Sequence, residues 1–539
     1  TITPKALSLS AVKVYDGATT LSGSQITMTG LIGTQTLNYT GANINDANVA
    51  TPNKYISSIT LTDGANGGLA SNYLAPTLTS AYTYNNATVN QKAVALSATK
   101  VYDANNTLTG GQVTINTGVS GETLTYSGAT VNDINVATAG KYINAITLGN
   151  AVSGNGVASN YLLPTLNSTN APVTITKASL TVTANAAAMT YGASVLPSFS
   201  ATITGFVGSD TSSAVTGTAS FSTNATPYNG QAGSGSSVGT YSITPALGSL
   251  ASGNYSFGVF SQGSLVVNKG NLTITASNDS KVYGASSTTA GVNYTAGGTA
   301  INSTAGYTTS GLVNGDTITA VTLTSTGGAV PTNVGTYTIT PSALVGGTNV
   351  TNSNYTISYI NASTGLAVNP KVVTLAATKT YDATNALNTV VISGLIGSQT
   401  LTYSGATTND VNVATTGKYL NAITLGNATD GSGGLAVNYA LPSLTVASAN
   451  NAVTITAKVV GLSASKTYDA TTTLTGAQVV ITTGVGSQTL SYTGATANDA
   501  NVATANKYIS AITLANATDS SGGLASNYAL PTLNNANAA

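Results

Sequence analysis

The sequence predicts an all-β protein built from tandem antiparallel β-sandwich modules. Val, Ile, Thr and Tyr, which favour half-buried pleated strands, occur in short runs along all 539 residues. Gly, Asn, Asp and Pro separate these runs at turn positions, as in the segment 63–68 (DGANGG). Tyr15 and Tyr102, in the phrases KVYDGATTL and KVYDANNTL, are 87 residues apart, and so are Tyr381 and Tyr468. A repeat of this length favours a small sandwich over a β-solenoid, whose period is about 20–30 residues.

Composition excludes several classes of function. Fifteen lysines balance fifteen acidic residues, so no net charge attracts nucleic acid or an anionic membrane surface. No apolar run reaches the roughly 18–20 residues of a membrane span. The chain has no Cys and no His, which removes disulfides, thiol and imidazole metal ligands and the usual catalytic bases. We therefore expect no enzyme activity, no metal and no cofactor.

The modules are of two kinds in the order A-A-B-B-A-A. A modules share the YD phrase, then TL.Y.GA, ND.NVAT, KY and NY..P.L, always in that order, whereas B modules carry TYG or VYG. In KY segments the alternation of Tyr55, Ile59 and Leu61 predicts a strand with these three side chains on one face. The predicted boundaries are a closing strand of a preceding module at 1–4, A modules at 5–91, 92–176, 371–457 and 458–539, and B modules at 177–269 and 270–370.

The two ends of the sequence match each other. Thr1–Thr3 (TIT) resembles the closing strand VTIT at Val173–Thr176 and Val453–Thr456, and the last module stops where its own closing strand would begin. Two interpretations stay open. The chain is an excerpt of a longer array, or Thr1–Thr3 of one copy completes the last sandwich of another copy by strand donation.

The repeated phrases resemble two known families. The A modules resemble YDG modules of large filamentous-haemagglutinin-like bacterial surface adhesins. The B modules resemble MBG modules, which are mostly bacterial Ig-like repeats, through GFVGSDT (Gly205–Thr211) and VGTYSITP (Val238–Pro245) and through GLVNGDT (Gly311–Thr317) and VGTYTITP (Val334–Pro341). The resemblance implies six Ig-like sandwiches in an elongated rod, secreted and extracellular or outer-membrane-associated on a Gram-negative bacterium, without enzymatic activity.

Charged residues recur at four positions of every A module, and we interpret them as structural polar positions. They are the YD lysine and aspartate, the ND aspartate and the KY lysine: Lys13, Asp16, Asp46, Lys54, Lys100, Asp103, Asp133, Lys141, Lys379, Asp382, Asp410, Lys418, Lys466, Asp469, Asp499 and Lys507. We expect the YD aspartate to accept turn amides and the YD lysine to pair with it or with the ND aspartate.

Three chemical alternatives compete with this structural interpretation. One is a Lys–Asn isopeptide bond assisted by the ND aspartate. The second is calcium binding at Asp63–Gly67 or the ND loop, although one carboxylate per loop favours a plain Asx turn. The third is a Ser–Lys dyad such as that in KASLTV from Lys177, which lacks a group to orient the base.

The function expected from these features is mechanical. The chain would be a structural shaft of a surface adhesin or extracellular filament, holding a binding tip away from the cell in cell-surface or biofilm-matrix adhesion. The alternative is a set of carbohydrate-binding, lectin-like modules that bind a surface glycan directly. Expected partners are neighbouring modules or like chains in a fibre, with no nucleic acid and no membrane insertion.

Overall fold

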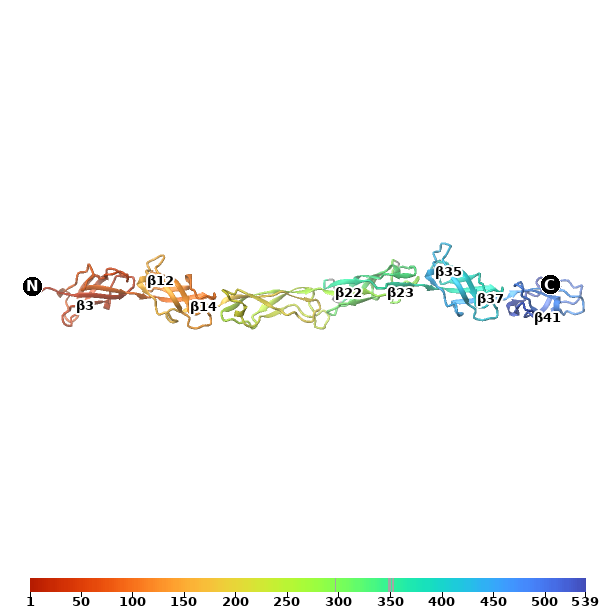
Figure 1. The fold of residues 1–539 in the computed structure, drawn as a ribbon, viewed down its shortest axis with the longest axis horizontal. Coiled ribbons are helices and arrows are strands. Elements are labelled where there is room, and N and C mark those ends of the chain that lie inside the picture. Colours follow the sequence, from red (N-terminus) through yellow and green to blue (C-terminus); the bar gives the residue numbers. More distant parts are fainter. Residues whose placement is uncertain (296, 348–349, 351–352) are drawn as a thin grey trace. The chain divides into compact units, whose positions relative to one another are not determined.

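The computed structural model describes residues 1–295, 297–347, 350 and 353–539, and within them the chain forms β-strands and short 3-10 turns (Figure 1). The prediction of an all-β chain of sandwich-like repeat modules is confirmed. The chain divides into two compact units. The first comprises 1–189, 195–227 and 238–268, and the second comprises 190–194, 228–237 and 269–539. Below, modules 1 to 6 denote the ranges predicted from the repeats.

The first sheet of modules 1, 2 and 5 has the opening strand at its centre. An antiparallel strand lies on one side and the closing strand lies on the other. These three-stranded sheets are, in modules 1, 2 and 5 respectively, β3-β2-β7 (Ile26–Thr29, Ser8–Val14, Asn85–Asn90), β10-β9-β14 (Val113–Asn116, Ala95–Val101, Val173–Thr176) and β33-β32-β37 (Val390–Ser393, Thr374–Thr380, Asn451–Thr456). The closing strand runs parallel to the opening strand, so these sheets are mixed rather than wholly antiparallel.

The second sheet of each A module is an antiparallel pair. The pairs are β4–β5 (Leu37–Ile44, Ile56–Asp63), β11–β12 (Thr125–Val131, Ile143–Gly149), β34–β35 (Thr402–Thr408, Leu420–Gly426) and β41–β42 (Ser491–Ala497, Ile509–Ala515). Each pair contains two register shifts, which in β4 lie next to Gly41 at φ +62°. The shifts change which residues face inward, so Ile56 rather than Tyr55 is fully buried. The predicted face of Tyr55, Ile59 and Leu61 was therefore wrong at its first member.

Short elements complete the A modules. Two-residue parallel pairs join each module start to its NY phrase: β1–β6 (Lys5–Ala6, Tyr73–Leu74), β8–β13 (Lys92–Ala93, Tyr161–Leu162), β31–β36 (Lys371–Val372, Tyr439–Ala440) and β38–β43 (Lys458–Val459, Tyr528–Ala529). The 3-10 turns are η1 (Gly23–Gln25), η2 (Ala70–Asn72), η3 (Gly110–Gln112), η4 (Ala158–Asn160), η7 (Ala436–Asn438), η8 (Gly476–Gln478) and η9 (Ala525–Asn527).

In the B modules, too, the opening strand pairs in parallel with a later strand of the module, β15 with β20 and β22 with β29. Module 3 contains β15 (Ala178–Ala184), β16 (Ala187–Thr190), β17 (Ala201–Thr204), η5 (Ser212–Ala214), β18 (Ser220–Thr223), β19 (Gly239–Ala246), β20 (Tyr255–Ser261) and β21 (Gly263–Asn268), in sheets β17-β15-β20 and β16-β21-β19-β18. Module 4 contains β22 (Gly270–Ala276), β23 (Asp279–Val282), β24 (Thr299–Ser303), β25 (Tyr307–Ser310), β26 (Ile318–Thr324), η6 (Thr326–Gly328), β27 (Gly335–Tyr337), β28 (Thr340–Gly346), β29 (Tyr355–Ile360) and β30 (Leu366–Asn369). Its sheets are β25-β22-β29, β23-β30-β27 and β24-β26-β28.

The core of an A module lies between its two sheets. In β2, Leu9 and Ala11 face inward, while Val12 faces solvent, as the two-residue period of a strand requires. Leu9 meets Ile44 and Ile56 of the second sheet in one buried cluster. Lys13 continues the inward-facing series, so a charged side chain occupies a core position and its ammonium group requires polar partners.

Candidate functional site

The YD phrase forms a closed turn around a buried lysine. The Lys13 Nζ lies 2.8 Å from Asp16 Oδ1 and donates hydrogen bonds of 2.9 Å to the carbonyl oxygens of Ala18 and Thr20. Asp16 Oδ1 also accepts from the Ala18 amide at 3.0 Å. The three ammonium donors therefore all have oxygen partners, which offsets the cost of burying the charge.

The same ion pair closes the turn in the other A modules. The Nζ–Oδ1 distances are 2.7 Å for Lys100–Asp103, 2.7 Å for Lys379–Asp382 and 2.6 Å for Lys466–Asp469. The hydrogen bond from Lys466, with the amide of Thr471, lowers the pKa of Asp469 to about 2. Of the two expected partners of the YD lysine, the structure places the YD aspartate against it, three residues along the chain in every A module.

The KY lysine holds a second turn, which we call the NV loop after its Asn-Val pair (Asn48–Val49 in module 1). Lys54 Nζ donates to the Val49 carbonyl at 3.0 Å and to that of Thr51. Asp46 Oδ1 accepts from the Asn48 amide at 2.6 Å, which makes an Asx turn. Burial lowers the pKa of Lys54, since desolvation disfavours its charge.

Each later A module repeats this arrangement. The KY lysine donates to the NV-loop valine carbonyl at 2.9 Å in every case: Lys141 to Val136, Lys418 to Val413 and Lys507 to Val502. The ND aspartate accepts from the loop asparagine amide: Asp133 from Asn135 at 2.7 Å, Asp410 from Asn412 at 2.7 Å and Asp499 from Asn501 at 2.6 Å. Four charged positions therefore shape two turns in each A module, which makes sixteen over the four modules.

These two turns meet the next module through a pair of tyrosines. Tyr15 of module 1 packs edge-to-face on Tyr161 of module 2, with ring centroids 5.4 Å apart. The two hydroxyls donate to the same carboxylate, that of Glu122, at 2.5 Å and 2.7 Å. We call this set of two tyrosines and one acceptor a tyrosine junction.

Among the described residues five tyrosine junctions occur, each within one compact unit. The others are Tyr102–Tyr255 on Asp210, Tyr191–Tyr355 on Asp316, Tyr283–Tyr439 on Gln399 and Tyr381–Tyr528 on Gln488, with centroid distances of 5.3, 5.4, 5.4 and 5.4 Å. The acceptor is a carboxylate in three junctions and an amide in two. Because a carboxylate oxygen and an amide oxygen both accept two hydrogen bonds, either type satisfies both hydroxyls.

Burial raises the pKa values of Tyr15 and Tyr255 in their junctions. Burial and the bond to Glu122 raise the pKa of Tyr15 to about 12. Burial also raises the pKa of Tyr255 to about 12, with a smaller contribution from Asp210. Tyr15 and Tyr255 are thus neutral phenols that donate hydrogen bonds at ordinary pH.

The NV loop makes a second contact across the same boundary. Asn160 of module 2 is fully buried. Its Oδ1 accepts from the Val49 amide at 2.8 Å, and its Nδ2 donates to Asn48 Oδ1 at 2.8 Å. The valine amide of the NV loop makes the same bond at three further boundaries, namely Val136–Asn254 (2.9 Å), Val334–Asn438 (2.8 Å) and Val413–Asn527 (2.8 Å). The lysine-held NV loops of modules 1, 2 and 5 therefore bind the NY asparagine of the next module, and the Asn333–Val334 turn of module 4 makes the same bond without a KY lysine.

Small residues allow close approach beside several junction tyrosines. Gly284 follows Tyr283 at φ +81°, and a Cβ built on it would lie 2.3 Å from Cδ1 of Ile396. Gly192 stands in the same relation to Val313, also at 2.3 Å. At the Tyr102 junction the sizes are exchanged, since Ala104 approaches Gly208. Side-chain volumes are matched across the boundary.

The chemical alternatives find little support in these contacts. An isopeptide bond needs a lysine Nζ beside an asparagine carboxamide, whereas Lys13 and Lys54 direct Nζ at main-chain carbonyls. Asp63 Oδ1 accepts from the Ala70 amide at 2.8 Å, as in a capped turn. Across the described ranges, no three His, Cys, Asp or Glu side chains gather as metal ligands would. Nor does any described helix have the length and apolarity to cross a membrane.

Sequence reasoning missed the junction residues. In the sequence the tyrosine of the YD phrase is only a repeat marker. The acceptor has no constant residue type, because it is Glu, Asp or Gln in different modules. A signal was present, since this residue always precedes a threonine in the phrases GETL, GSDT, NGDT and GSQT. Lys281 of module 4 was also missed. It is buried and donates to the Gly328 and Ala329 carbonyls at 3.0 and 2.9 Å.

Comparison with known proteins finds a family similar to the B modules. Residues 180–266 and 272–364 each match the family model of the MBG domain (YGX type). No curated protein sequence matches the chain significantly. Among solved structures, the crystal structure of Drosophila N-cadherin EC1-4 aligns over 62% of this chain and 94% of its own length. The identity is 10% and the TM-score is 0.14, which is too low to carry an argument.

Proposed function

We propose that the chain is a structural shaft of a secreted bacterial surface adhesin or extracellular filament. It would hold a binding tip away from the cell in cell-surface or biofilm-matrix adhesion. The observation that carries this proposal is the parallel pairing of the first and last long strands in modules 1, 2 and 5. Six residue pairs join β2 to β7, six join β32 to β37, and four join β9 to β14.

Parallel pairing determines how such a module responds to tension. The chain enters at the start of the opening strand and leaves at the end of the closing strand. Because the two strands run the same way, pulling these ends apart slides one strand along the other. All hydrogen bonds of the ladder then resist together, instead of opening one after another as in a hairpin pulled from its open end.

The junctions support the same function. A chain that carries load needs boundaries that transmit it, and each tyrosine junction adds an aromatic contact and two hydrogen bonds to the covalent connection. The MBG matches indicate a repeat-rich extracellular surface protein. Absence of cysteine suits export of a long unfolded chain, since no wrong disulfide can form. We place the protein at the cell surface of a Gram-negative bacterium or in the surrounding matrix.

Single-molecule stretching of the whole chain tests this proposal. We expect a series of unfolding events, each releasing roughly 300 Å for ~87 residues at ~3.5 Å per residue. In β37 the Val453 amide donates to Lys418, so by strand alternation the next amide, that of Thr454, faces β32. Thr454→Pro removes this ladder donor and should move one event per molecule to lower force. Unchanged forces in the variant, or smooth extension of the native chain, would overturn the shaft proposal.

Direct glycan binding is the competing function. A shallow groove of about 620 Å³ in module 2 and one of about 500 Å³ in module 6 have equivalent linings, including Tyr126 and Tyr492. However, the Tyr126 hydroxyl donates to the Gly110 carbonyl at 2.8 Å and is not free for a sugar. We expect no heat when soluble oligosaccharides are titrated into the protein, and saturable binding would favour the lectin-like function.

A further inference from the structure

Module 2 has an open groove between the edges of its two sheets. The groove has a volume of about 620 Å³ and lies between β10 and the first half of β11. It is lined by buried Leu108, Val113 and Ala129 and by half-buried Ile115 and Tyr126, among others. We call it the edge groove. Because β10 is the outermost strand of the sheet β10-β9-β14, one wall of the edge groove is the edge of a strand.

The main-chain groups of Val113 and Ile115 face the edge groove. Val113 lies opposite Ala98 of β9, and the Ala98 amide donates to the Pro172 carbonyl at 2.9 Å on the other side of β9. Val113 and Ala98 are therefore a non-hydrogen-bonded pair of the antiparallel ladder, so the N–H and C=O of Val113 point away from β9. Two residues further along β10, at a spacing of about 6.7 Å, Ile115 has the same orientation.

A tyrosine hydroxyl already takes the place of a strand partner at the first of these positions. The Tyr126 hydroxyl donates to the Gly110 carbonyl at 2.8 Å and accepts a hydrogen bond from the Val113 amide. In module 5 the Val390 amide likewise donates to the equivalent Tyr403 hydroxyl, at 2.8 Å. The phenol accepts and donates as the peptide group of a paired strand would. This strand edge is therefore suited to a partner that offers both a donor and an acceptor.

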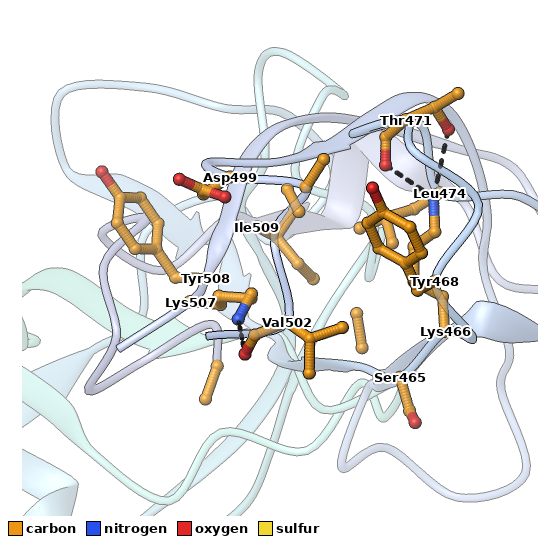
Figure 2. Close-up of a pocket in the computed structure, with 14 residues that line it drawn as sticks. Ser465, Lys466, Tyr468, Thr471, Leu474, Asp499, Val502, Lys507, Tyr508 and Ile509 are labelled. Atoms are coloured by element: carbon orange, nitrogen blue, oxygen red, sulfur yellow. Dashed lines mark hydrogen bonds between the residues drawn. The ribbon is translucent and has the colours of Figure 1, made fainter. Parts of the chain in front are cut away.

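The lining of the edge groove favours an uncharged occupant. In the part of the chain that the structure describes, this lining consists of Thr, Ser, Tyr, Gly, Ala, Val, Leu and Ile, none of which is charged. The pocket of module 6 in Figure 2 differs, because Lys466, Asp499 and Lys507 line it. A charged ligand in the edge groove would lose hydration without gaining an ionic partner. An uncharged strand would instead pair with the Ile115 groups through its main chain and bury side chains on the apolar floor.

We propose that the edge groove of module 2 binds an extended, uncharged peptide segment of a partner protein, which adds as a strand to the outer edge of β10. Val, Ile or Thr at alternate positions of the segment would pack into the groove, because β-branched residues favour strands. The four residues of β10, at ~3.3 Å each, give a contact about 13 Å long. This proposal goes beyond the shaft function, since the shaft itself would hold a second protein along its length.

Hydrogen exchange at the Ile115 amide of the whole chain tests the proposal, because this amide faces the edge groove. The ligand used is the peptide acetyl-STVTVS-amide. With the peptide at ten times its Kd, exchange at Ile115 should slow about 11-fold. The same peptide with all its central amides N-methylated lacks strand donors and is the control. It should leave the exchange unchanged, and equal protection by both peptides would overturn strand addition.

The variant Tyr126→Phe makes a second, independent test. It removes the hydroxyl that occupies the Val113 amide and the Gly110 carbonyl, so both groups become available to the peptide. One added hydrogen bond should lower the Kd measured at Ile115 by roughly 2- to 12-fold. Tyr39→Phe makes the same change in module 1, where the hydroxyl donates to Gly23, and should leave this Kd unaltered. A Kd that is unchanged or higher in Tyr126→Phe would overturn the proposal.

The other possible occupants give different results. Soluble oligosaccharides that slow exchange at Ile115 where the peptide does not would assign the edge groove to the lectin-like function and overturn the proposal. Protection of Ile115 that rises with protein concentration alone, with larger species in sedimentation velocity, would assign the edge to a second copy of the chain and also overturn it. An Ile115 amide that responds to none of these would overturn it as well. The stretching test of the shaft does not depend on any of these outcomes.

Discussion

Replacing the acceptor of the first tyrosine junction should uncouple modules 1 and 2 without unfolding either. Glu122→Ala removes the carboxylate that accepts from Tyr15 and Tyr161, leaving two buried hydroxyls without their partner. Glu122→Gln keeps the length of the side chain and an oxygen that accepts two bonds. Glutamine already fills this role at Gln399 and Gln488, so the second variant should behave like the native chain.

The size of the effect follows from the two bonds. Each buried hydroxyl left without a partner costs roughly 1–3 kcal/mol, and water entering the vacated space recovers part of this. A loss of about 2–4 kcal/mol in closing the boundary corresponds to opening that is roughly 30- to 700-fold more frequent. The assay is native-state hydrogen exchange at the Val49 amide, whose bond to Asn160 exists only across this boundary.

The second unit supplies an internal control. The Val413 amide makes the same bond to Asn527 and should exchange at the same rate in the native chain and both variants. The reasoning is refuted if Glu122→Ala changes Val49 exchange by less than about threefold, which lies within the error of independent sites. Equal acceleration by Glu122→Gln would also refute it, because the amide would then not be an equivalent acceptor.

Three further predictions concern the turns and the boundary. Lys141→Met should destabilise module 2 by about 2–4 kcal/mol in urea unfolding, because two NV-loop carbonyls lose their donor. Gly284→Ala should lower thermal stability by about 1–3 kcal/mol more than Gly291→Ala, since both glycines have φ +81° but only the first meets Ile396. Raising the pH should destabilise the chain between pH 10 and about 12 in thermal melts, because the folded state raises the pKa of Tyr15 and unfolding releases its proton.

Each of these has a control and a contradicting outcome. Lys5→Met changes an exposed lysine and should leave urea unfolding unaltered; equal loss in both lysine variants would mean that charge alone matters. Ile396→Val should restore part of the stability lost in Gly284→Ala, and a strictly additive double variant would contradict steric contact. Stability that is constant from pH 9 to 12 would contradict the buried, neutral state of the Tyr15 phenol.

The fold class was predictable because it depends on features that repeat. Strand-forming residues, turn residues and a fixed period all indicate sandwich modules, and four copies reinforce one another. Pairing direction was not predictable in this way, since parallel and antiparallel strands use the same residue alternation. The register shifts in β4–β5 also escaped prediction, because a bulge at Gly41 looks in sequence like any glycine within a strand.

The charged positions were predictable as a set, and so was the turn formed by the YD lysine and aspartate, but the partners of the KY lysine were not. Their recurrence at fixed positions showed that they have a structural role. The partners of Lys54, however, are main-chain carbonyls, and because every residue has a carbonyl the sequence does not reveal which ones Lys54 binds. The junction was harder, because its three members lie in two modules and are separated by 107 residues between Tyr15 and Glu122. The repeat period aligns residues at the same position of each module, so it does not reveal contacts between different positions, such as that of Tyr15 with Glu122.

The B modules show that the module boundary requires the tyrosine of the YD phrase and does not require its lysine. Two residues before the junction tyrosine, module 1 has Lys13 and module 4 has Lys281, but module 3 has Met189, packed in an apolar cluster. Tyr191 nevertheless forms a complete tyrosine junction with Tyr355 and Asp316. The lysine therefore closes the turn: its aliphatic stem packs in the core and its ammonium group binds the turn. The tyrosine and its acceptor make the boundary. Module type can therefore vary along the chain, from A to B and back to A, while the boundary chemistry stays constant.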